Sequence, residues 1–219
     1  LTSYNYKRNL DSHMMKNTEW GAVAYLSHSK YGIDREININ NNNSFKTGYS
    51  ALPSTNQQTY QGTYGDGSSY NQQYNTEIGY LASTTRNITG VYDMSGGALE
   101  YVAGYISGKQ GSSGLTPTNY NSKYFDVYNV SSTQTSYQYR ILGDATGEMG
   151  PFKNYLDGDN TSRYHNSWYS DYSYFVDSSY PWFTRGGSYY HGVLAGQFGF
   201  CRSTGATSGD IGFRLVLAP

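Results

Sequence analysis

Apolar residues in this chain of 219 residues occur in short runs, and long polar segments separate those runs. The segments 38–76 and 108–135 are rich in Asn, Ser, Thr, Gly and Tyr, so they bury little apolar surface and are expected to form surface loops. No apolar run approaches the ~18–20 residues that span a membrane. This pattern predicts one α+β domain over residues 1–219, with a small core and unusually many loops.

The net charge and the absence of known motifs exclude several classes of function. Lys and Arg number 15 against 16 Asp and Glu, and this net charge of −1 argues against nucleic acid as a partner. The single cysteine, Cys201, excludes an internal disulfide and a multi-cysteine zinc site. The four histidines form no metal-binding pattern, and no nucleophile-elbow, P-loop or dinucleotide-binding motif is present. We therefore predict no catalytic residue, metal or cofactor; Asp157-Gly158-Asp159-Asn160 resembles only part of a calcium loop and is expected to be a polar turn.

One helix is expected over residues 17–31. Asn17 or Thr18 can cap it, Glu19 suits its positive end, and Gly32 can stop it. One face of this helix is expected to be buried. His28 lies within the helix and is expected to be an ordinary surface or capped side chain. The stripe on the buried face comprises Trp20, Val23, Ala24 and Ser27.

The expected strands are short. Residues 99–106 are predicted to form a buried strand, residues 138–142 another, and residues 181–185 a strand that enters the Gly186-Gly187 turn. Residues 212–217 are apolar and β-branched enough for a core strand. Val91-Tyr92 could end a further strand, Gly65-Asp66-Gly67 is expected to be a turn, and residues 1–13 are expected to be irregular.

Two segments resemble the formylglycine-generating-enzyme-like domains. Residues 90–101, GVYDMSGGALEY, are similar to that family's G-L-x-D-M-x-G-N-V-W-E-W motif. Residues 185–188 followed by 211–216 are similar to its R-G-G-S-W … I-G-F-R-L-V ending. The resemblance implies a C-type-lectin-like fold, with two helices around a small antiparallel sheet.

The departures from that family bear on its chemistry. Catalytic members use two cysteines near the C-terminus where this chain has one, so their oxidation chemistry is not expected. Gly97 replaces the Asn that related domains use around calcium, together with the Glu that matches Glu100, so calcium is only a weak alternative. The family's opening strand is not recognisable in residues 1–13. We therefore expect the chain to be the C-terminal part of a longer surface protein, with that strand missing or supplied separately.

A second resemblance is sharper. Residues 185–217, RGGSYYHGVLAGQFGFCRSTGATSGDIGFRLVL, resemble the variable region of proteins diversified by diversity-generating retroelements, which is copied with errors at the adenines of Asn codons. Residues that match the invariant positions of that pattern are called fixed residues. They include Gly192, Ala195-Gly196, Gly205-Ala206 and Leu215-Val216-Leu217. Those expected to act as supporting scaffold are Arg185, Gly186, Gly187, Tyr189, Phe198, Phe200, Phe213 and Arg214.

Codon arithmetic tests the positions between these fixed residues. Changing the adenines of AAC cannot produce Lys, Glu, Gln, Met or Trp, and none of these five occurs at the candidate positions. Gln197 is one of the five excluded types, but it occupies a position that is not Asn in the family pattern. The candidate ligand-binding positions are Ser188, Tyr190, His191, Val193, Leu194, Gly199, Cys201, Arg202, Ser203, Thr204, Thr207, Ser208, Gly209, Asp210 and Ile211.

These resemblances imply binding rather than catalysis. The varied side chains should project into solvent, with Tyr189 and Tyr190 as anchors, while Phe198, Phe200 and Phe213 are buried at about 1.5–3 kcal/mol each. Arg214 is expected to form a structural ion pair or loop clamp. The hypothesis is a receptor or adhesin for a protein or glycan, outside the cell on a pilus or phage particle.

The mode of attachment is left open. Residues 13–32 resemble pilin-like proteins of gut bacteria that carry an N-terminal membrane helix, so a membrane would be reached only through a segment outside this chain. The alternatives are a phage tail-fibre adhesin, which shares the binding function, and a diverged enzyme of the formylglycine-generating type.

Overall fold

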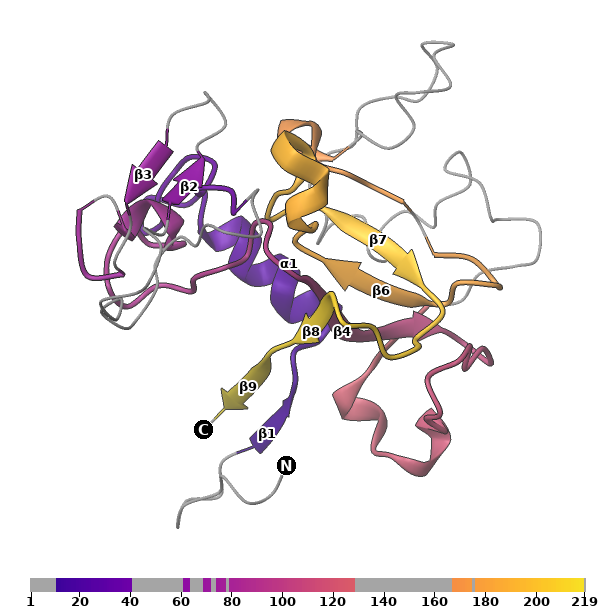
Figure 1. The fold of residues 1–219 in the computed structure, drawn as a ribbon. Helices are drawn as coiled ribbons and strands as arrows, with labels where there is room; N and C mark the ends of the chain where they lie inside the picture. The colour runs from indigo at the N-terminus through magenta and orange to yellow at the C-terminus, as the bar shows by residue number, and fades with distance from the viewer. Residues whose placement is uncertain are drawn as a thin grey trace, which may run out of the picture.

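The computed structural model describes residues 11–40, 61–63, 69–71, 74–77, 79–128, 167–174 and 176–218. Within these ranges the chain is α+β, as expected (Figure 1). The described part holds one α-helix, α1 (Asn17–Leu26), rather than the two expected. The other helical segments are 3₁₀ turns: η2 (Gly79–Ala82), η3 (Pro117–Asn119), η4 (Ser122–Tyr124), η8 (Trp168–Ser170) and η9 (Tyr189–Leu194).

The main sheet contains five strands. Their order is β5 (Asp126–Tyr128), β4 (Leu99–Ile106), β6 (Trp182–Arg185) and β7 (Phe200–Ser203), while β8 (Ile211–Phe213) pairs with the first half of β4. The β4–β6 and β6–β7 pairs are antiparallel, but β5 and β8 run parallel to β4. The expectation of a purely antiparallel sheet is therefore wrong. A separate hairpin joins β2 (Gln61–Thr63) to β3 (Ser69–Asn71).

The strand predictions for residues 99–106 and 181–185 are confirmed, because β4 and β6 lie there. Val91-Tyr92 does not belong to a strand. The expected strand at residues 138–142, the turn at 65–67 and the Asp-Gly-Asp-Asn segment at 157–160 lie outside the described residues. No helix in the described ranges is long and apolar enough to cross a membrane.

Helix α1 packs its apolar stripe into the core beside the sheet. Trp20 and Ala24 are fully buried, and Val23 packs at the edge of the same cluster as Phe183 and Phe198. The helix ends at Leu26 rather than at residue 31, so His28 lies just beyond it.

Tight turns end α1, because the amides of His28 and Ser29 donate to carbonyls three residues back. Gly32 belongs to the chain reversal that follows. A side chain at that position would place its Cβ 2.1 Å from the carbonyl oxygen of Ser27.

A strand precedes α1 where irregular chain was expected. β1 (Asp11–Met14) pairs antiparallel with β9 (Leu215–Ala218), and Figure 1 shows the two side by side. The prediction that residues 1–13 hold no strand is wrong over residues 11–13. The polar sequence of β1 shows no strand pattern, because the strand is specified by backbone pairing with the far end of the chain.

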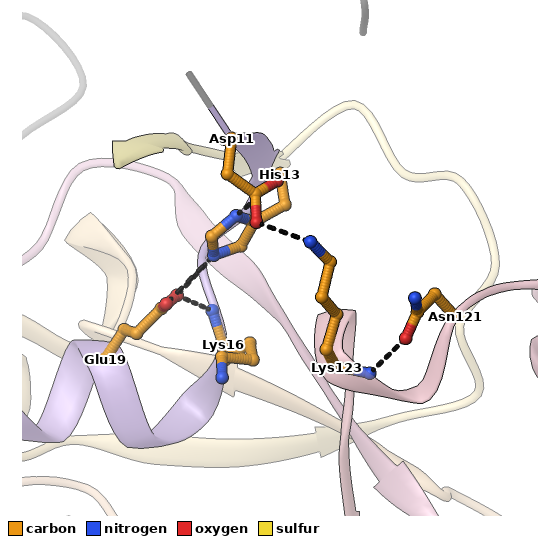
Figure 2. A network of polar contacts seen from close by, with 6 residues as sticks. All are labelled: Asp11, His13, Lys16, Glu19, Asn121 and Lys123. Atoms are coloured by element: carbon orange, nitrogen blue, oxygen red, sulfur yellow. Dashed lines mark hydrogen bonds and ion pairs between the residues drawn. The ribbon is translucent and has the colours of Figure 1, made fainter. Parts of the chain in front are cut away.

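Polar contacts join β1 to α1 and η4, as Figure 2 shows. The Asp11 carboxylate pairs with Lys123 Nζ at 3.0 Å, and His13 Nε2 lies 2.9 Å from Glu19 Oε1. Lys16, rather than Asn17 or Thr18, occupies the N-cap position of α1, and its backbone N–H donates to Glu19 Oε2 at 2.8 Å. Asn17 is instead buried, and its side chain makes tertiary hydrogen bonds.

The C-terminal segment is not the core strand that its apolar sequence predicted. It divides into β8 and β9 at Arg214, and Phe213 and Leu217 are 61% and 57% exposed. Val216 in β9 is partly buried and packs against the core. Side chains alternate between the two faces of a strand, and the described residues cover only one face of this two-stranded ribbon.

Candidate functional site

The candidate binding positions lie on one continuous stretch that leaves β6, forms η9, returns through β7 and runs to β8. Gly186 and Gly187 make the turn out of β6 with φ of +83° and +68°. A Cβ at position 187 would lie 2.7 Å from Ala195 Cα, so this turn requires glycine. The amide of Gly196 donates to the carbonyl of Gly186 at 3.1 Å, which closes the loop over the core.

Most fixed residues of 185–200 are buried, whereas Tyr189, Gly192 and the fixed residues from Gly205 to Leu217 keep solvent access. Phe198 and Phe200 are buried as predicted. The other buried fixed residues of residues 185–200 are Arg185, Gly186, Gly187, Ala195 and Gly196. Among the candidate positions, thirteen of fifteen keep solvent access. The exposed ones are Tyr190, Val193, Thr207, Ser208, Gly209 and Asp210, and the partly exposed ones are His191, Leu194, Cys201, Arg202, Ser203, Thr204 and Ile211.

Ser188 and Gly199 do not project into solvent, so the expectation of exposure is wrong for both. Ser188 is 4% exposed, because its backbone N–H donates to His191 Nδ1 at 2.8 Å and draws the residue under η9. The Gly199 carbonyl accepts from the Gly186 amide and from Arg185 Nε. A Cβ at position 199 would lie 2.9 Å from the carbonyl oxygen of Gly196, so a side chain there meets backbone.

Arg185 holds the base of this loop from inside the core. The side chain is fully buried and donates from Nη1 to Asn17 Oδ1 at 2.8 Å and from Nε to the Gly199 carbonyl at 3.1 Å. Its guanidinium also lies 5.9 Å from the Trp20 ring. These contacts tie the turn after β6 to α1, which fits the expected supporting role.

Gln197 is a supporting residue that the sequence analysis did not identify. It is fully buried, and its Nε2 donates to Ser27 Oγ at 2.7 Å, while its backbone carbonyl accepts from Trp20 Nε1 at 2.8 Å. Its residue type could have identified it from the sequence. Gln197 is the one residue between the fixed positions that adenine changes in an Asn codon cannot produce. His28, whose Nε2 lies 2.8 Å from the same amide, stacks on Trp168.

Arg214 is the structural clamp that the sequence predicted. Its guanidinium pairs with both oxygens of Glu100, from Nη2 to Oε1 and from Nε to Oε2. It also donates to the carbonyls of Tyr92 and Asp93 at 3.1 and 3.0 Å. Phe213 beside it is a correction, because this residue is 61% exposed and does not belong to the buried core.

The ion pair between Arg214 and Glu100 bears on whether calcium could bind at residues 97 and 100. Both Glu100 oxygens are taken by the Arg214 guanidinium, and position 97 is a glycine without a side-chain ligand atom. The described residues contain no group of three or more His, Cys, Asp or Glu side chains that could hold a metal ion. Residues 97 and 100 therefore do not fit a calcium ion.

A cavity of about 290 Å³ opens beside the loop that precedes β8. Candidate positions Thr207, Ser208 and Ile211 contribute to its wall, and Tyr101 and Trp182 lie on the scaffold side. The Tyr101 hydroxyl lies 2.5 Å from Ser203 Oγ and donates to the Ala206 carbonyl at 2.8 Å. Varied side chains thus border a mostly apolar hollow whose scaffold wall is fixed by hydrogen bonds.

Burial favours the neutral forms of two titratable side chains on this surface, Cys201 and His191. Burial raises the pKa of the Cys201 thiol to about 11, so it is protonated at neutral pH and a poor nucleophile. Burial lowers the pKa of His191, whose ring stacks on Tyr172 at 4.3 Å and accepts a hydrogen bond from Ser188. The arrangement is suited to contact and hydrogen bonding.

Comparison of the chain with protein-family models, with curated proteins and with solved structures finds no match in any of the three. The site is therefore assigned from its own residues and geometry.

Proposed function

We propose that the chain is a surface-displayed ligand-binding protein, a receptor or adhesin, whose region 185–217 is diversified by adenine-directed mutagenesis from a retroelement template. The supporting scaffold is C-type-lectin-like, and the protein is displayed on a pilus or a phage particle. The ligand is a protein or a glycan, and it undergoes no chemistry at the site.

The observation that carries this proposal is the solvent access of most of the candidate positions. Thirteen of the fifteen candidate positions have solvent access, while Gln197, whose residue type an Asn codon cannot reach by adenine change, is fully buried. A diversified surface needs this arrangement, because large-to-small or polar changes are costly in a packed core and nearly neutral at exposed sites.

The chemistry of the exposed positions also suits recognition. Tyr190 is 77% exposed and stacks on Tyr189 at 4.2 Å, so it offers a large contact area with little loss of rotamer freedom. Val193 adds an apolar contact, and Thr207 and Ser208 add adaptable hydrogen bonding beside the cavity. Such a mixture of rigid aromatic and small polar side chains is typical of antibody paratopes.

A diverged enzyme of the formylglycine-generating type is less well supported. Its oxidation chemistry uses paired cysteines, whereas Cys201 is the one cysteine of the chain and its thiol is protonated at neutral pH. A phage tail-fibre adhesin differs from our proposal in attachment and shares its binding surface.

A pair of display libraries tests the proposal. In one, the thirteen solvent-accessible candidate positions of the full chain carry the residues that AAC can reach. In the other, the seven buried fixed residues of 185–200 carry the same set. We expect the first library to stay resistant to protease and to yield binders against panels of proteins and glycans, and the second to lose protease resistance. Equal loss of resistance, or a folded first library without binders, would contradict the proposal.

A further inference from the structure

Arg202 occupies a cage formed by residues outside the variable stretch. Its guanidinium carbon lies 3.8 Å from the centre of the Tyr174 ring and 4.6 Å from the centre of the Tyr180 ring. Nη2 donates to the Tyr174 hydroxyl at 2.6 Å, and Nη1 forms an ion pair with Asp177 Oδ2. The side chains of Arg202 and Asp177 are 24% and 13% exposed, so the pair is largely removed from solvent.

The backbone of the cage and the Asp177 carboxylate are held in place by contacts that do not involve Arg202. The other Asp177 oxygen, Oδ1, accepts from the amides of Ser179 and Tyr180 at 2.8 and 3.0 Å, which fixes the carboxylate in a turn. The amide of Tyr174 donates to the Phe200 carbonyl at 3.0 Å and so fastens this wall to the edge of β7. Shortening the side chain at position 202 should therefore leave the Asp177 carboxylate and the backbone of both tyrosines where they are.

The chemistry of this cage selects a planar organic cation. Tyrosine faces attract a cation, and a guanidinium stacks on rings and pairs with a carboxylate more effectively than an ammonium does. Neutral sugars carry no such group, whereas arginine side chains are common on protein surfaces.

We propose that Tyr174, Asp177 and Tyr180 form a binding site for an arginine side chain of a protein ligand, and that Arg202 of this chain fills it. Copies of the chain with a short residue at position 202, such as Ser, Gly or Ala, present the site open. Variation at position 202 thus switches an arginine subsite on or off. This use in recognition rests on the proposed function, while the affinity of the cage for a guanidinium stands on its own contacts.

The test uses the full chain with R202S and two matched probes, N-acetyl-arginine amide and its neutral analogue N-acetyl-citrulline amide, which has nearly the same shape. Binding is followed by NMR shifts of tyrosine ring signals at constant ionic strength. We expect saturable binding of the arginine probe to R202S, at least about tenfold weaker binding to the R202S/D177N double variant, and no saturable binding to the parent chain. Equal binding of both probes to R202S, or binding of neither, would overturn the proposal.

A second measurement does not depend on how well R202S folds. In the parent chain the Nη protons of Arg202 should exchange slowly with water, and D177N should accelerate that exchange at least about tenfold. Unchanged exchange in D177N would show that the cage does not hold the guanidinium. Failure of the proposed function is seen separately, as invariant codons in region 185–217, so the two outcomes can be distinguished.

Discussion

Replacing Phe198 by alanine should cost much more stability than replacing Tyr190, eight residues earlier in the same loop. Phe198 is fully buried and its ring centre lies 4.9 Å from that of Trp168 and 5.9 Å from that of Tyr25. Its N–H donates to Asp171 Oδ2, and alanine would keep that bond. The substitution therefore removes the side-chain packing alone.

The magnitudes follow from burial. Truncating a buried Phe to Ala costs about 3–5 kcal/mol, which combines lost transfer energy with the cavity left behind. This is a large part of the roughly 5–15 kcal/mol by which ordinary domains are stable. Tyr190 is 77% exposed and loses little more than its stack on Tyr189, so Y190A should cost at most about 1 kcal/mol.

Urea unfolding of the full-length variants, followed by tryptophan fluorescence, measures both free energies of unfolding. V193A is the matched control, because Val193 is a second exposed candidate position in η9. We expect Y190A and V193A to unfold close to the parent chain and F198A well below it. A loss for Y190A as large as that for F198A would refute the division of this loop into support and display.

Three further outcomes follow from the structure. R214A should lower the free energy of unfolding by about 3 kcal/mol in urea melts, because it leaves the mostly buried Glu100 carboxylate without its partner, and R214K should recover only part of that loss. Cys201 should react slowly with iodoacetamide at pH 8, and its rate should rise about tenfold per pH unit toward its pKa of about 11; a rate at pH 8 equal to that of a free thiol would contradict its burial. Burial raises the pKa of Glu36 from 4.5 to about 7, so its neutral form adds stability that is complete below pH 4.5 and is lost as the pH rises through 7. In urea melts at a series of pH values, E36Q should flatten this fall in the free energy of unfolding. An unchanged dependence on pH would exclude Glu36 as its source.

Several elements could be predicted from the sequence because their signals are local. The apolar run Leu99–Ile106 forms β4, and the Arg-Gly-Gly motif follows β6 where a left-handed turn demands glycine. The α1 stripe around Trp20 and the burial of Phe198 also follow from apolar spacing and from the fixed slots of the motif.

The errors have a common physical origin in long-range pairing. β1 is polar and becomes a strand only because β9 lies beside it, and Phe213 looks like a core residue but sits on the open face of an edge strand. Ser188 and Gly199 are buried by backbone contacts with η9 and the Gly186 turn, which no side-chain pattern records. Gln197 was recognisable as unusual by its codon, although only its contacts with α1 show what it does.

The most direct test of the central claim is deep sequencing of codons 185–217, with the flanking DNA, across a population of the source. We predict substitutions concentrated at the thirteen solvent-accessible positions, with Gln197 and the buried fixed residues unchanged, next to an Asn-codon template repeat and a reverse transcriptase gene. A uniform sequence without a template, or changes spread equally over buried and exposed positions, would contradict the account.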